Sequence, residues 1–67
     1  MNWNAEFCND PYDDYNLVIQ IYYNDEEIAI IRRTEGKLEL QWYPCENAIT
    51  LPVDWLLALL IEAEKRL

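Results

Sequence analysis

The chain has 67 residues and a formal net charge of −8, with five basic residues, thirteen acidic residues and no histidine. This balance argues against direct binding of nucleic acid or of an anionic membrane, because both need clustered Lys or Arg side chains. The length suits one domain, and a hydrophobic fraction of 52% can supply a compact core.

The acidic residues are unevenly distributed along the chain. Residues 1–31 carry seven acidic side chains and no basic one. Complementary charge accelerates the encounter of two proteins, so this pattern favours a basic protein partner. Acidity can also serve only to keep a small apolar protein soluble, and the sequence leaves that alternative open.

Most residues that carry catalysis are missing. The chain has no His and no Ser, which excludes the Ser-His-Asp and Cys-His arrangements. Its sole glycine, Gly36, cannot form a glycine-rich loop for phosphate. Asp10, Asp13 and Asp14 lack the spacing of an EF-hand calcium loop. We therefore expect no enzyme activity, no cofactor and no metal.

The location of the protein is predicted from its ends and its cysteines. The N-terminus lacks a basic start followed by an apolar run, and the longest apolar run covers only residues 55–61. We expect a cytoplasmic protein in which Cys8 and Cys45 are free thiols, while a disulfide between them is the alternative.

Residues 1–16 are rich in Asn and Asp and are punctuated by aromatic side chains. Trp3 and Phe7 lie four residues apart, which fits one helical turn over residues 4–8 that the Asn9-Asp10-Pro11 segment ends. We expect an N-terminal arm whose aromatic residues pin it to the core. The alternative is an acidic, aromatic lip that contacts a partner.

Three runs of β-branched and aromatic residues predict strands over residues 17–23, 28–33 and 37–43, and residues 48–51 allow a short fourth strand. A two-residue second loop would place Leu38, Leu40 and Trp42 on the face of Ala29, Ile31 and Arg33. We favour a three-residue loop, because it alone carries one apolar face through all three strands.

The favoured register assigns every strand residue to a face. The predicted inner face is Leu17, Ile19, Ile21, Ile28, Ile30, Leu38, Leu40 and Trp42. The predicted outer face is Val18, Gln20, Tyr22, Ala29, Ile31, Arg33, Glu39, Gln41 and Tyr43. The outer mixture of aromatic, aliphatic and amide groups fits either a protein interface or an ordinary solvated face.

Residues 52–67 predict one C-terminal helix. Pro52 suits the first helical position, and Asp54 and Lys65 suit the ends of the helix dipole. One apolar stripe is predicted from Val53, Leu56, Leu60, Ala63 and Leu67. The sequence thus predicts a single α+β domain, an antiparallel three- to four-stranded β-meander over residues 17–51 followed by one C-terminal helix packed on one sheet face.

In size, charge and missing chemistry the chain resembles small single-domain protein inhibitors, such as bacterial immunity proteins, antitoxins and phage-encoded inhibitors of host enzymes. The leading hypothesis is an inhibitor or immunity-type protein that occupies a basic surface of a target such as a nucleic-acid-handling enzyme. Carboxylates would replace phosphates and tyrosines would anchor the contact. The predicted partner-binding residues are Asp10, Tyr12, Asp13, Asp14, Tyr15, Tyr22, Asp25, Glu26 and Glu27.

The second hypothesis is a structural or adaptor subunit that forms a homodimer. The helix has more apolar residues than one face needs, and the outer sheet face is mixed, so both offer a surface for a second copy. The acidity would then serve only solubility. The predicted dimer-interface residues are Ile31, Tyr43, Trp55, Leu59 and Ile61.

Overall fold

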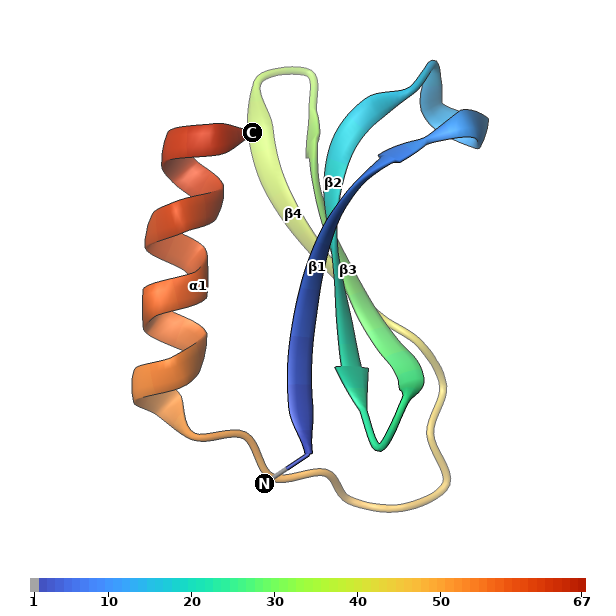
Figure 1. Ribbon diagram of the computed structural model, residues 1–67, viewed down its shortest axis with the longest axis vertical. Coiled ribbons are helices and arrows are strands. Elements are labelled where there is room, and N and C mark those ends of the chain that lie inside the picture. Colours follow the sequence, from blue (N-terminus) through green and yellow to red (C-terminus); the bar gives the residue numbers. More distant parts are fainter. Residues whose placement is uncertain (1) are drawn as a thin grey trace.

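The computed structural model describes residues 2–67. Within them, one antiparallel sheet is formed by β1 (Trp3–Asp10), β2 (Asn16–Tyr23), β3 (Glu26–Thr34) and β4 (Lys37–Trp42), and a short 3-10 turn, η1 (Pro11–Asp13), joins β1 to β2. The helix α1 (Val53–Arg66) follows as a second layer on one face of the sheet (Figure 1). The predicted α+β meander with a C-terminal helix is confirmed.

The N-terminal segment is a strand rather than an arm. β1 pairs with β2 along its whole length, from Trp3 opposite Tyr23 to Asp10 opposite Asn16. The helical turn expected over residues 4–8 does not form. A spacing of four residues places Trp3 and Phe7 on one side of a strand as well as of a helix, so the spacing did not distinguish the two. Residues 48–51 are not a strand.

The β2–β3 and β3–β4 hairpins have two-residue loops. Asn24 and Asp25 have φ of 52° and 66°, and Glu35 and Gly36 have φ of 52° and 82°. Positive φ at both central residues is the requirement of a type I′ turn, whose twist matches that of the flanking strands. The predicted three-residue second loop is therefore wrong, because Glu35 adopts the left-handed conformation beside Gly36.

A β-bulge in the β2–β3 hairpin restores one continuous apolar face. Ile21 lies opposite Ala29, but Tyr22 lies opposite Glu27, so Ile28 is an extra residue in β3. The bulge reverses the alternation of β3. Ala29, Ile31 and Arg33, predicted on the outer face, consequently lie on the helix side, and Ile30, predicted on the inner face, lies on the other.

The core lies between the sheet and α1. Its buried members are Ile19, Ile21, Ile28, Ala29, Ile31 and Ala63, and Leu38, Leu40, Leu59, Leu60 and Trp55 pack against them. Ala63 is fully buried, and its small side chain suits close approach of the helix to the sheet. Each large aliphatic side chain buried here stabilises the fold by about 1.5–3 kcal/mol.

The helix is rotated relative to the predicted stripe. Val53 was expected in the core but is 76% exposed, whereas Trp55 and Leu59 pack against the core cluster. Trp55 lies 5.9 Å from Trp3, between ring centroids, and Trp3 packs against the core as expected of an aromatic residue in the N-terminal segment. Among residues 2–67, no helix is long and apolar enough to cross a membrane.

Candidate protein-interaction site

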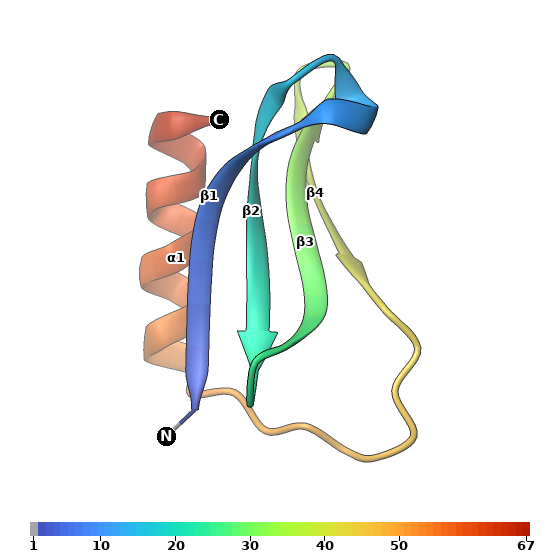
Figure 2. The same ribbon diagram turned by 45° about the vertical axis from the view of Figure 1, so that its right-hand side comes forward.

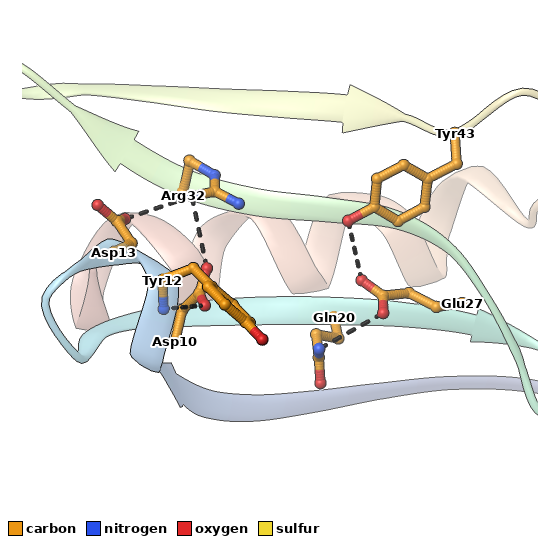
Figure 3. A network of polar contacts seen from close by, with 7 residues as sticks. All are labelled: Asp10, Tyr12, Asp13, Gln20, Glu27, Arg32 and Tyr43. Carbon is orange, nitrogen blue, oxygen red and sulfur yellow. Dashed lines mark hydrogen bonds and ion pairs between the residues drawn. The ribbon is translucent and has the colours of Figure 1, made fainter.

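The sheet face that points away from α1, here called the open face, carries a chain of hydrogen bonds. The Tyr43 hydroxyl donates to Glu27 Oε2 at 3.0 Å, and Gln20 Nε2 donates to Glu27 Oε1 at 3.4 Å (Figure 3). The Tyr22 hydroxyl donates to Gln20 Oε1 at 3.0 Å. Both carboxylate oxygens of Glu27 are therefore engaged within the protein.

These polar side chains surround buried apolar residues of the open face. Ile30 is 3% exposed and lies between Gln20 and Gln41 in the ladder, and Val18 is 1% exposed beside Cys8. Figure 2 shows α1 on the opposite side of the sheet, so the helix does not cover either residue. The hydrogen-bonded side chains of Gln20, Glu27 and Tyr43 belong to the same face of the sheet as these two buried residues.

The electrostatics of the open face disfavour further negative charge. Burial, the hydrogen bond to Glu27 and the charge of Glu27 raise the pKa of Tyr43 above its ordinary value of 10.0. Burial, assisted by Glu27 and Glu6, raises the pKa of Tyr22 in the same way. Burial and the charge of Asp10 raise the pKa of the Cys8 thiol. These three groups remain neutral near pH 7 and act here as hydrogen-bonding or apolar groups.

At one end of the sheet lies a compact turn, here called the tyrosine tip, residues 10–15. Asp10 caps η1, since its carboxylate accepts from Tyr12 N at 3.0 Å, and Pro11 occupies the first position of the turn. The Tyr15 N–H donates to the Asp10 carbonyl at 2.8 Å, and Asn9 Nδ2 donates to the Tyr15 carbonyl at 2.9 Å. The backbone of the tip is thus held at both ends.

Arg32 of β3 ties the tip to the sheet. Its Nη1 lies 3.3 Å from Asp13 Oδ2 and 3.6 Å from Asp10 Oδ2 (Figure 3). The tip backbone also includes two strained residues, because Asp14 and Tyr15 have φ of 52° and 59°. The Arg32 ion pairs and three hydrogen bonds therefore hold a conformation that the two residues would otherwise disfavour.

The tip presents its tyrosines to solvent. Tyr12 is 98% exposed and Tyr15 is 68% exposed, although the backbone that carries them is held in place. Asp14 is exposed beside them, while Asp13 is partly neutralised by Arg32. The result is a preorganised aromatic surface with a negative rim.

The structure divides the predicted partner-binding residues into two groups. Asp10, Tyr12, Asp13, Asp14 and Tyr15 gather at the tip, whereas Asp25 and Glu26 lie at the β2–β3 turn at the opposite end of the sheet (Figure 1). β2 has eight residues, which separates the groups by roughly 25 Å at about 3.3 Å per residue. Tyr22 and Glu27 lie between them in the hydrogen-bond network of the open face.

The predicted dimer residues are also separated. Ile31 is 1% exposed under α1, and Trp55 and Leu59 pack on the same core. Tyr43 is engaged with Glu27, so Ile61, at 49% exposed, is the member of this group that offers a free surface. Other large apolar side chains are also exposed, those of Val53, Leu57 and Trp42, which the predicted dimer interface did not include.

Sequence reasoning also missed the role of Arg32. It is one of five basic residues, and nothing near it in the chain marks it as the partner of Asp10 and Asp13, which lie about twenty residues away. A local signal did exist for the turn itself. The Asp-Pro pair at residues 10–11 is typical of a capped helical start, because the aspartate caps and the proline needs no N–H partner.

Residues 2–67 contain no group of three or more His, Cys, Asp or Glu side chains placed to hold a metal ion. Cys8 is partly buried and Cys45 is exposed, and both are free thiols, as predicted. Comparison with protein-family models, with curated proteins and with solved structures found no match.

Proposed function

We propose that this chain is a non-catalytic protein-binding module, an inhibitor or immunity-type protein that covers a basic surface of a target such as a nucleic-acid-handling enzyme. The tyrosine tip is its anchor, and the acidic residues around the tip orient the target. The observation that supports this proposal is the exposure of Tyr12 and Tyr15 on a backbone that a cap, an ion-pair bridge and two further hydrogen bonds hold in place.

Preorganisation is what makes this tip suited to binding. A flexible loop loses conformational entropy when it binds, but a turn that is already ordered avoids most of that cost. Tyrosine combines a large apolar ring with one hydroxyl, and it is enriched among residues that dominate binding energy. A solvated tyrosine that merely tolerates exposure would not need the Asp10 cap or the Arg32 bridge.

Charge indicates the chemistry of the partner. The chain has a net charge of −8, and the tip adds the exposed carboxylate of Asp14 next to both tyrosines. Attraction to a basic surface steers the encounter and weakens as salt screens it. A partner with a lysine- or arginine-rich surface that accepts two aromatic side chains fits these properties.

The test uses the full chain, immobilised through a C-terminal tag and exposed to lysate of the organism that encodes it, at low and at high salt. Captured proteins are identified by mass spectrometry, and the affinity of the principal one is then measured in purified form. We expect the Tyr12→Ala/Tyr15→Ala variant to bind it at least about 30-fold more weakly, a loss of at least about 2 kcal/mol.

A charge-matched pair of variants separates the tip from general acidity. Asp13→Asn/Asp14→Asn and Asp25→Asn/Glu26→Gln each remove two negative charges, but they act at opposite ends of the sheet. We expect the tip variant to weaken binding strongly and the turn variant to have little effect. Equal losses from both variants, or full binding by the double tyrosine variant, would contradict an anchor at the tip.

A further inference from the structure

The free edge of β4 is a candidate interaction surface separate from the tyrosine tip. β4 is the last strand in the order β1-β2-β3-β4, so within residues 2–67 it has a neighbour on one side only. The Tyr43 N–H donates to the Ile28 carbonyl of β3 at 2.9 Å. Because successive residues of an antiparallel strand direct their N–H and C=O groups to opposite sides, Leu38, Leu40 and Trp42 direct theirs to the free edge.

The side chains of these three residues are incompletely covered. They lie on the helix side of the sheet with Ile31 and Ala29, which are buried, yet Leu38 and Leu40 are only half-buried and Trp42 is 48% exposed. The covered apolar layer therefore stops before the edge of the sheet is reached.

The helix adds exposed apolar surface of its own. Val53, Leu57 and Ile61 are 76%, 56% and 49% exposed and follow one another every four residues. At 100° per residue, Val53 and Leu57 lie beside Glu64 on the helix flank. Glu64 is 3.7 Å from Arg33 Nη2, so this flank is directed toward the β3 and β4 side rather than toward β1.

The sequence of β4 is complementary to itself in one antiparallel register. With Leu40 opposite Leu40 of a second copy, Leu38 lies opposite Trp42, and Glu39 lies opposite Gln41. All three outward residues then exchange backbone hydrogen bonds, and the joined sheet keeps its apolar residues on one face. Lys37 and Glu39 leave this strand without net charge, so the net −8 of the chain is not concentrated at the contact.

The adjacent registers are disfavoured by specific residues. A shift by two in one direction places Glu39 opposite Glu39 of the second copy, and like charges directly opposite one another are destabilising. A shift by two in the other direction places Leu38 opposite Pro44, which has no N–H to donate. The register centred on Leu40 avoids both.

We propose that two copies of this chain pair through β4, antiparallel and with Leu40 on the two-fold axis, to form one continuous eight-stranded sheet with both helices on the same face. The contact is isologous, so it closes at two copies. The exposed stripe of each helix and the Leu38, Leu40 and Trp42 side chains of both copies then bound one shared apolar surface.

The other free edge, β1, is less available for the same pairing. Trp55 packs against Trp3, and the Arg66 guanidinium lies 4.0 Å from the centre of the Phe7 ring. Side chains of α1 thus lie over the face of β1 at its first residue and near its middle. A helix placed close to an edge strand is one of the means by which proteins restrict strand addition.

The first experiment measures mass by light scattering after size-exclusion chromatography, with the untagged full chain alone over a wide range of concentration. We expect a species of twice the 8.1 kDa chain mass that dissociates on dilution. Leu40→Lys, which apposes two cations on the axis, is expected to give the chain mass. Its control, Gln41→Lys, introduces the same charge one residue away, opposite Glu39 of the second copy, and should retain the doubled mass.

A second experiment reads the register and does not depend on the stability of the lysine variant. In a Cys8→Ala/Cys45→Ala background, Leu40→Cys should cross-link on oxidation, because directly opposite residues have Cα atoms about 5.5 Å apart, within the range of a disulfide. Leu38→Cys should not, because it faces Trp42 of the second copy.

Three results would overturn the proposal. They are a single chain mass for the unmodified protein at every concentration, cross-linking by Leu38→Cys but not by Leu40→Cys, and a ladder of species larger than two copies, which would show β4 pairing with β1. None of these measurements involves the partner of the tyrosine tip, so either proposal can fail without the other.

Discussion

The two faces of the sheet bury apolar residues by different means. On the helix side, Ile31 is 1% exposed beneath α1, inside an apolar cluster that includes Ala63. On the open face, its neighbour Ile30 is 3% exposed although α1 lies on the other side of the sheet, and this face carries polar side chains that hydrogen-bond to one another. A small chain can therefore protect both faces of a sheet while it builds only one covering layer.

The difference has a physical origin in the covering groups. Packed side chains of a helix are confined and cannot move to fill a void, whereas long polar side chains at a surface can settle into one. We therefore expect the helix side to depend on shape and the open face to depend on hydrogen bonding and charge. Three predictions test this expectation.

The largest effect should come from truncating the buried isoleucine on the helix side. Ile31→Ala is expected to decrease the free energy of unfolding by about 2–5 kcal/mol, toward the upper end of that range, because α1 cannot collapse onto the void. Ile30→Ala removes the same atoms from the adjacent residue and should lie in the lower part of that range. Urea denaturation followed by circular dichroism measures both, and equal losses would contradict the contrast between the faces.

A smaller effect is expected from removing the acceptor at the centre of the open-face network. Glu27→Ala leaves the Tyr43 hydroxyl and the Gln20 amide without their partner and should cost about 1–3 kcal/mol. The matched control is Glu26→Ala, which removes the same side chain from the exposed neighbouring residue and should stay within about 0.5 kcal/mol. If both variants unfold at the same urea concentration, Glu27 does not hold the open face together.

The smallest effect at neutral pH should be that of Tyr43→Phe, and its signature is a change in pH dependence. Burial and Glu27 raise the pKa of Tyr43 in the folded protein, so above about pH 10 the unfolded chain ionises first. The contribution of this pKa shift to the free energy of unfolding is fully present below the ordinary tyrosine pKa. It is lost as the pH rises toward the pKa of Tyr43 in the folded protein. Tyr22 contributes in the same direction, so the variant should retain only part of this fall.

The pH experiment compares urea midpoints of the two proteins at mildly and at strongly alkaline pH. The decrease in urea midpoint between the lower and the higher pH should be smaller for Tyr43→Phe than for the unmodified protein, whatever the difference between the two proteins at neutral pH. A loss of the same size in both proteins would show that Tyr43 ionises equally easily in the folded and unfolded states.

The sequence was most informative where its signals are local. β-branched runs predicted β2, β3 and β4, and the dipole pattern with Pro52 predicted α1 nearly to its ends. The absence of His and Ser and the excess of acid are properties of composition, so the expectation of a non-catalytic, protein-binding chain needed no coordinates. Tyr12, Tyr15 and the aspartates of the tip were also selected from the chain alone.

What the tertiary structure decided was which groups those local elements place together. The bulge at Ile28 and the left-handed Glu35 changed the register, and with it the face of Ile30, Ile31 and Arg33, because a shift of one residue moves every following side chain to the other side. β1 is a strand only because β2 offers it an edge.

Non-local pairing likewise decided which candidate surfaces are free. Arg32 pairs with Asp10 and Asp13, which therefore support the tyrosine tip. Glu27 accepts a hydrogen bond from Tyr43, and Trp55 packs against Trp3. Residue type and spacing along the chain determine what a side chain can do. Whether it remains available to a partner depends on neighbours that folding brings from distant parts of the chain.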